Sequence, residues 1–199
     1  SEWYEHNGST ADAIHHALTA QDFERTAALV ERVLPTMRRN RQDTVVLGWL
    51  TALPEEVIQC RPVLSLGYAW ALLAGGKLDA VEPRLRDAER WLDTTADSHP
   101  ESHPEQQPKR VVVDEEQFRL LPGMIAIYRA AHALTMGDVP NTVKYAQSAL
   151  DFFPKDELLG SGAAVALLGL AFWTNGELEA AHRTYADGMA KGQIAGNLS

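Results

Sequence analysis

The sequence predicts an all-α protein made of repeated helix–turn–helix units, an α-α solenoid. Apolar residues recur at three- and four-residue spacing in almost every segment, which is the period of one face of a helix. No segment alternates apolar and polar residues over the length of a strand. The β-branched run at 111–113 is the one candidate, and it is too short to define a strand. A turn residue followed by the same pattern of apolar and small residues recurs four times along the chain.

The N-terminal helices are delimited by residues that begin or end helices. An Ala-rich segment at 10–20 forms the first predicted helix, and Asp22 is placed to cap the second, at 23–37. A third apolar segment, at 43–53, is stopped by Pro54. The sequence therefore predicts three consecutive helices before this proline.

The next helices begin with favourable first-turn residues and end with glycine. Glu55 and Glu56 follow Pro54 in a first turn, where carboxylates stabilise the positive end of a helix. Pro62 occupies the first position of another helix, which the pair Gly75-Gly76 closes. The remaining predicted helices cover 78–92, 117–136, 139–153, 158–174 and 178–191.

The composition is that of an ordinary globular protein and limits the classes of function. Of its 199 residues 45% are hydrophobic, and 18 Lys and Arg against 27 Asp and Glu give a formal net charge of −9. This length suits one domain over 1–199, and the acidic charge excludes a surface that wraps nucleic acid. A single cysteine excludes a disulfide framework. The chain has neither a run of about 20 apolar residues nor a signal peptide, so we expect a cytoplasmic protein that does not enter a membrane.

One stretch interrupts the helical pattern. Residues 94–110 contain three prolines and no aliphatic residue larger than Ala, so they cannot bury enough apolar surface to offset the entropy of ordering them. We predict a mobile Pro/His-rich insertion loop over 94–112. Its His99 and His103 each precede a proline, which disfavours the helix that shared metal ligation would need, and we interpret both as solvated.

Four helical units align on the residue that turns the chain between their two helices. The turn residues are Gln21, Gly76, Gly137 and Gly176. Five residues after each turn comes a small or β-branched residue: Thr26, Val81, Thr142 and Ala181. Seven residues before the last three turns stand small residues that let two helices approach closely: Ala69, Ala130 and Gly169. The predicted units cover about 10–40, 43–93, 113–154 and 157–192.

These offsets resemble tetratricopeptide repeats, which are helix pairs that stack into a superhelix through small residues at fixed positions. The usual repeat length is about 34 residues. Here the last two turns lie 39 residues apart, and Gly76 and Gly137 lie 61 apart because the Pro/His-rich segment intervenes. The longer spacing points away from a generic peptide-binding repeat and toward a particular variant.

Two runs of residues resemble one family. The first run contains Trp3-Tyr4-Glu5, Ala13-Ile14, Ala17-Leu18 and Asp22-Phe23, and the second contains Trp49-Leu50, Leu53-Pro54-Glu55-Glu56 and Arg61-Pro62. In this order they resemble the region that follows the winged-helix domain in MalT-like transcriptional activators, which are large, ATP-dependent, STAND-class proteins with a LuxR-type DNA-binding domain at the C-terminus. The stretch 169–197 is also similar to their repeats, so the resemblance extends over nearly the whole chain apart from 94–112.

The resemblance implies a role that depends on modules outside this segment. In such proteins an N-terminal NTPase module binds ATP, the helical-repeat region senses a small-molecule inducer or a regulatory protein, and a C-terminal helix-turn-helix binds DNA. This chain contains no GxxxxGK[ST] loop and no basic recognition helix, so we expect no cofactor in this segment and no direct contact with nucleic acid. Because an isolated stretch of repeats leaves a stacking face uncovered, we also expect self-association or a frayed terminus.

No residues in the sequence support catalysis. Cys60 has no neighbouring base in the sequence and is interpreted as a small packed residue. His15 and His16 lie on adjacent faces of one helix and cannot both face one metal ion. The chain contains no GxSxG, HExxH or EF-hand pattern, so we predict neither an enzyme nor a metal site.

The candidate ligand-binding residues belong to the first helices of the last three units, at 62–75, 118–136 and 158–174, which we expect to line the concave side of the superhelix. The candidates are Tyr68, Trp70, Tyr128, Arg129, His132 and Trp173. Aromatic faces can stack on a sugar or another small inducer, and the Arg and His side chains can supply hydrogen bonds. The alternative, which the sequence favours, is that the same aromatic residues pack between repeats.

Two functions remain open from the sequence. The first is the sensor or protein-interaction segment of a MalT-like activator, which relays the binding of an effector to the NTPase and DNA-binding modules. The second is a generic tetratricopeptide-type scaffold that binds a peptide or a partner protein and has no role in transcription. A phosphate-binding loop upstream and a helix-turn-helix downstream in the parent reading frame would distinguish them.

Overall fold

The computed structural model describes residues 2–93, 110–154 and 157–196, and every regular element in these ranges is helical. In chain order the helices are α1 (Glu2–Thr19), α2 (Phe23–Arg39), α3 (Asp43–Thr51), α4 (Glu55–Gln59), α5 (Pro62–Ala74), the 3₁₀ turn η1 (Leu78–Ala80), α6 (Val81–Asp93), α7 (Glu115–Thr135), α8 (Val139–Phe152), α9 (Leu158–Thr174) and α10 (Leu178–Gly196). The prediction of an all-α protein is confirmed. Among the described helices, none combines the length and the apolar character of a membrane span.

The helix boundaries follow the sequence signals closely. Asp22 caps α2 by accepting a hydrogen bond from the backbone N–H of Arg25 at 3.1 Å. Four boundaries differ from the prediction in a way that matters. α1 begins at Glu2, eight residues before the predicted start at 10, and α10 continues to Gly196, beyond the predicted end at 191. α3 ends at Thr51, since Leu53 donates to the carbonyl three residues earlier and closes a turn before Pro54. The helix predicted from residue 78 begins with the tighter turn η1 before it continues as α6.

The helices form two compact units, 1–121 and 122–199, and the boundary falls within α7. Pro122 occupies that boundary inside the helix, where a proline removes one backbone hydrogen bond. The predicted insertion loop at 94–112 lies outside the described residues except for 110–112.

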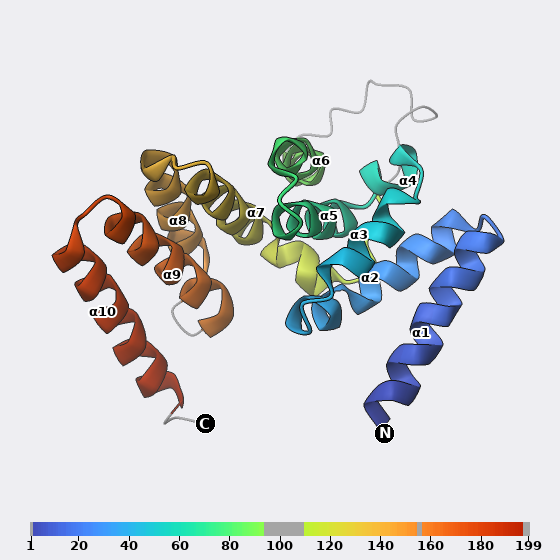
Figure 1. Ribbon diagram of the computed structural model, residues 1–199, viewed down its shortest axis with the longest axis horizontal. Helices are drawn as coiled ribbons and strands as arrows, with labels where there is room; N and C mark the ends of the chain where they lie inside the picture. The colour runs from blue at the N-terminus through green and yellow to red at the C-terminus, as the bar shows by residue number, and fades with distance from the viewer. Residues whose placement is uncertain (1, 94–109, 155–156, 197–199) are drawn as a thin grey trace. The chain divides into compact units, whose positions relative to one another are not determined.

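In the first unit α5 packs on α2, α3, α4 and α6, and α1 packs on α2 (Figure 1). α5 carries no charged residue, and its apolar side chains cover nearly its whole circumference, which is typical of a helix surrounded by others. The core of this unit includes Ile14, Val30, Leu34, Val46, Leu50, Ile58 and Leu64.

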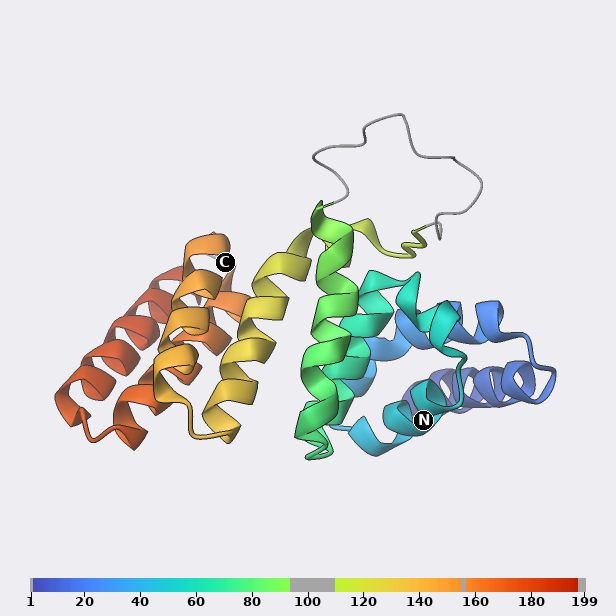
Figure 2. The same ribbon diagram turned by 90° about the horizontal axis from the view of Figure 1, so that it is seen from above.

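In the second unit α9 packs on both α8 and α10 (Figures 1 and 2). Ala130 of α7, Ala146 of α8 and Leu168 of α9 form the centre of its core. The close contact between α9 and α10 requires glycine at position 169, because a Cβ there would lie 2.4 Å from the Tyr185 ring. Small residues thus set how closely these helices approach.

The four turns on which the sequence units align share one backbone geometry. Their turn residues have left-handed φ angles: +56° at Gln21, +70° at Gly76, +75° at Gly137 and +81° at Gly176. In every case the turn N–H donates to the carbonyl three residues earlier, and the following N–H donates to the carbonyl five residues before itself. This is the Schellman pattern that ends a helix. A fifth copy, which the sequence alignment did not include, occurs at Arg41 (φ +54°) between α2 and α3.

The residues five positions after the aligned turns are all buried. Their exposed fractions are 0% for Thr26, Val81 and Thr142 and 5% for Ala181. The hydroxyls of Thr26 and Thr142 donate to the carbonyls of Asp22 and Asp138, both at 2.8 Å. Asp138 also caps α8 as Asp22 caps α2, so the two helices begin in the same way.

Candidate functional site

The six candidate residues divide between the two units. Tyr68 and Trp70 lie on α5 in the first unit, whereas Tyr128, Arg129, His132 and Trp173 belong to the second, on α7 and α9. Each unit therefore carries its own part of the predicted surface.

Tyr68 is half-buried against the core of the first unit, and an arginine covers its ring. The guanidinium carbon of Arg84 lies 4.8 Å from the centre of the Tyr68 ring, which is a cation–π contact. Arg84 is itself held by Glu55, with distances of 2.5 and 2.7 Å between guanidinium nitrogens and carboxylate oxygens, and by Asp87 at 3.1 Å. Its donors are committed to carboxylates of its own unit, so Tyr68 is part of the packing between α4, α5 and α6.

The Glu55–Arg84 pair shifts the pKa values of both of its members. Hydrogen bonds from Arg84 lower the pKa of the Glu55 carboxyl below its ordinary value, more than partial burial raises it. The same hydrogen bonds raise the pKa of Arg84. Both groups are therefore charged at neutral pH, and the pair links the short helix α4 to α6.

Trp70 is also half-buried and lies beside an arginine. The guanidinium carbon of Arg38, in the last turn of α2, lies 5.8 Å from the centre of a Trp70 ring. Trp70 also packs against the core cluster of the first unit. The indole thus contacts both the core and a cation.

The candidates in the second unit differ strongly in exposure. Tyr128 is 4% exposed and is a core residue, while Arg129 and His132 are half-buried. The guanidinium of Arg129 lies 5.9 Å from the centre of the Tyr145 ring on α8. Trp173, in the last turn of α9, is 60% exposed. Of the six candidates it offers the most ring surface to a ligand.

α9 presents further apolar surface to solvent. The helix contains no charged residue, and Leu159 near its start is 84% exposed. Leu159 and Trp173 are 14 residues apart, which is close to four helical turns, so they lie on the same side of α9. An uncharged helix with large exposed apolar residues on one side is typical of a binding surface.

A buried charge network that the sequence analysis did not identify lies in the first unit. Arg61, just before α5, places Nη1 3.3 Å from Glu31 and Nη2 2.7 Å from Glu24, both on α2. The side chains of Arg61 and Glu31 are 5% and 1% exposed, whereas that of Glu24 is 68% exposed. The Nε atom of Arg61 is buried and has no hydrogen-bond partner among the described residues.

Burial raises the pKa of the Glu31 carboxyl above its ordinary value of 4.5. The N–H of Val113 and the guanidinium of Arg61 oppose that rise, and the charge of Asp114 adds to it. The backbone N–H of Val113 donates to Glu31 at 3.4 Å, and that of Val111 donates to the carbonyl of Cys60 at 2.8 Å. The segment that precedes α7 is thereby attached to α2 and to the start of α5. The sequence signal was Glu31 itself, an acidic residue within the apolar face of α2.

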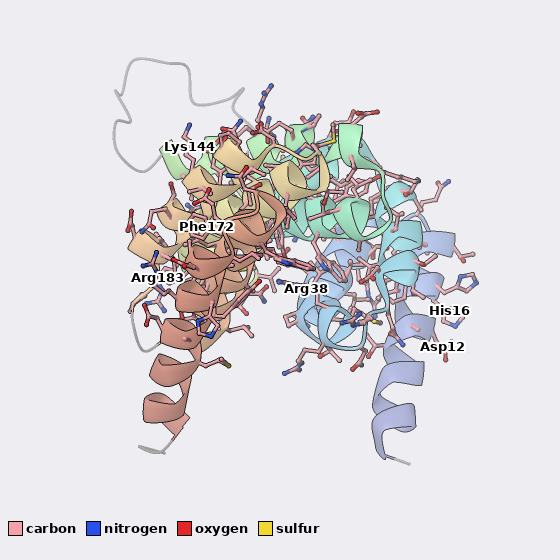
Figure 3. All side chains as sticks on the ribbon, turned by 60° about the vertical axis from the view of Figure 1, so that its left-hand side comes forward. Asp12, His16, Arg38, Lys144, Phe172 and Arg183 are labelled. Atoms are coloured by element: carbon pink, nitrogen blue, oxygen red, sulfur yellow. The ribbon has the colours of Figure 1, made fainter. Side chains whose placement is uncertain are left out.

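The histidine and cysteine side chains singled out in the sequence do not gather at one place in the described residues. The described residues contain no group of three or more His, Cys, Asp or Glu side chains that could hold a metal ion. His15 and His16 have ring centres 6.3 Å apart with tilted planes, and His16 projects outward from α1 (Figure 3). Cys60 is a half-buried free thiol.

Comparison with curated proteins finds the serine/threonine-protein kinase PknK of Mycobacterium tuberculosis, in two strains, and of Mycobacterium bovis. The identity is 33% over 104 residues, which is 49% of this chain and 9% of the kinase. The chain therefore spans less than a tenth of the length of these relatives. No family model matches the chain, and no solved structure matches it.

Proposed function

We propose that this chain is the sensor and protein-interaction repeat segment of a MalT-like, ATP-dependent transcriptional activator. The main support is the recurrence of one turn geometry at all four positions where the sequence units align: Gln21, Gly76, Gly137 and Gly176. Equivalent helix pairs joined by equivalent turns are what a tetratricopeptide-like superhelix requires. The similarity to a stretch that makes up 9% of a kinase further supports a segment that works within a much larger protein.

The proposed effector site centres on the exposed side of α9. Trp173 supplies an aromatic face for stacking, and Leu159 extends the apolar surface along the helix. Arg129 and His132 of α7 are the polar groups proposed to orient the effector through hydrogen bonds. In the first unit Trp70 is the corresponding aromatic residue, although Arg38 and the core leave less of it to a ligand.

The relay requires the effector to bind one state of the parent protein better than another. A shift from about 1% to about 99% of the active state needs a difference of about 10⁴-fold in affinity. ATP belongs to the NTPase module of the parent protein in this proposal, and DNA belongs to its helix-turn-helix. The acidic repeat segment, with its net charge of −9, contacts the effector or a regulatory protein.

The parent reading frame provides the first test. We expect a phosphate-binding loop encoded upstream of this segment and a helix-turn-helix encoded downstream. If neither is present, the proposal fails and the chain is better explained as a scaffold for a peptide or partner protein, for which the exposed apolar side of α9 would be the binding surface.

The second test is made in the full-length regulator. Trp173→Ala should abolish the transcriptional response to the inducer, because it removes the stacking face, while circular dichroism shows unchanged helicity. Trp70→Ala should weaken the response in the same way. Val45→Ala is the matched control, since Val45 is 46% exposed but lies on α3, outside both proposed binding surfaces. A Trp173→Ala variant that folds and responds normally would show that the effector binds elsewhere.

A further inference from the structure

The outer face of α10 carries large apolar side chains that no described residue covers. Leu178 and Met189 are 61% and 65% exposed, and His182 is exposed as well. The three residues follow each other at spacings of four and seven, so they lie on one face of the helix. Leu178 and His182 border a shallow hollow of about 380 Å³ together with Glu179 and Arg183.

The positions of α8 that are equivalent to this face of α10 differ from it in burial. Counted from their turns at Gly137 and Gly176, Val143 corresponds to His182 and Leu150 to Met189. Val143 and Leu150 are partly buried against the core cluster to which Leu168 of α9 contributes. These positions of α8 are therefore packed against a core, whereas the corresponding positions of α10 are exposed among the described residues.

The charges beside this face are arranged for pairing with a copy of themselves. Glu179 and Arg183 are exposed, lie one helical turn apart, and form no ion pair with each other or with any other described residue. Arg183 projects from the surface of α10 (Figure 3). When two such helices lie antiparallel about a two-fold axis near Ala181, each Glu179 faces the Arg183 of the other copy, and both pairs form at once.

We propose that this face of α10 binds a second copy of the same chain as an antiparallel, two-fold symmetric helix pair. Leu178 and His182 of each copy pack into the hollow of the other, and two Glu179–Arg183 pairs flank this apolar contact. The contact is isologous, so it closes as a dimer and does not continue into a filament. Because one helix face is a small interface, we expect a weak dimer with a dissociation constant of about 10–100 μM.

The experiment measures association of the 199-residue chain by sedimentation velocity over a concentration series. The wild-type chain should change from monomer to dimer as its concentration increases. Leu178→Ser should weaken the dimer by about tenfold or more, whereas the control Leu159→Ser, on the exposed side of α9, should leave it unchanged. Glu179→Arg and Arg183→Glu should each weaken it similarly, since each places two pairs of like charges in contact. All four residues are exposed, so the variants should keep the helicity of wild type.

The mixture of the two charge variants distinguishes this geometry from other contacts. Glu179→Arg and Arg183→Glu, each of which associates more weakly than wild type alone, should form a heterodimer of wild-type affinity when mixed, because every charge then faces its opposite. The double variant Glu179→Arg/Arg183→Glu should dimerise as wild type does. A chain that stays monomeric up to about 500 μM, well above the expected range, overturns the proposal. The proposal is also overturned if the charge variants associate as strongly as wild type, or if their mixture fails to associate. Those results would assign the face to a different partner.

Discussion

Arg61 and Glu31 form a buried ion pair across 30 residues of sequence, with 3.3 Å between Nη1 and a carboxylate oxygen and side-chain exposures of 5% and 1%. The pair joins the residue before α5 to the middle of α2, and the N–H of Val113 donates to the same carboxylate. Desolvation makes such a pair costly to form, but the removal of one partner leaves a buried charge uncompensated. The first unit should therefore be sensitive to single changes here.

Glu31→Ala should lower the free energy of unfolding by about 3 kcal/mol, because it leaves the Arg61 guanidinium buried with only an exposed carboxylate as its partner. Chemical denaturation followed by circular dichroism measures this. The control Glu24→Ala removes the partner that is 68% exposed and should cost about 0–1 kcal/mol. Equal effects of the two substitutions would contradict the assignment of Glu31 as the essential partner.

The stability of the first unit should depend on pH through Glu31. Burial raises the pKa of its carboxyl in the folded state above 4.5, so the folded state binds more protons than the unfolded state between 4.5 and the raised pKa. The contribution of Glu31 to the free energy of unfolding is therefore largest below pH 4.5 and falls as the pH rises through the raised pKa.

Denaturation of wild type and Glu31→Gln from about pH 4.5 to neutral tests this dependence. The wild type should lose stability relative to the variant as the pH rises, because the variant cannot titrate. The flanking charges are those of Arg61, Glu24 and Asp114, so Glu24→Gln serves as the control and should preserve the slope. A difference between wild type and Glu31→Gln that is constant with pH would refute the prediction.

Two glycines of α9 should respond in opposite directions to alanine. At Gly169 a Cβ would lie 2.4 Å from the Tyr185 ring, so Gly169→Ala should cost about 1–3 kcal/mol as α10 is displaced. At Gly162 a Cβ meets nothing within 4 Å, so Gly162→Ala should stabilise the helix by about 0.5–1 kcal/mol. Thermal unfolding of the two variants compares them directly. A Gly169→Ala variant as stable as wild type would mean that the helices separate at little cost.

Substitutions at two equivalent turn positions should change stability in opposite directions. Gly137 has φ +75° in open space, so Gly137→Ala should destabilise by about 1 kcal/mol through backbone strain alone. Gln21 has φ +56° at the equivalent position, and Gln21→Gly should stabilise by a similar amount. Denaturant midpoints of both variants provide the measurement. If Gln21→Gly is destabilising, contacts of the Gln side chain outweigh the strain.

The helices and their turns could be predicted because their signals are local. Caps such as Asp22, stops such as Pro54 and the turn glycines act within a few residues of their own positions, so most helix ends agree with the structure to within two residues. The exposure of the candidate ligand residues could not be predicted in this way. The spacing placed Tyr128 and Trp173 on similar first helices, but packing made one 4% and the other 60% exposed.

The sequence alone determined the all-α class, the order of the helices and the equivalence of their turns, since these depend on hydrogen bonds between neighbours and on which residues tolerate a left-handed φ. Only the tertiary structure decided which distant residues meet. Glu31 with Arg61 and Glu55 with Arg84 are pairs some 30 residues apart, and nothing in the local sequence of either partner specifies the other. Such pairs depend on how whole helices pack, and that packing also decides which apolar faces, such as that of α10, remain open.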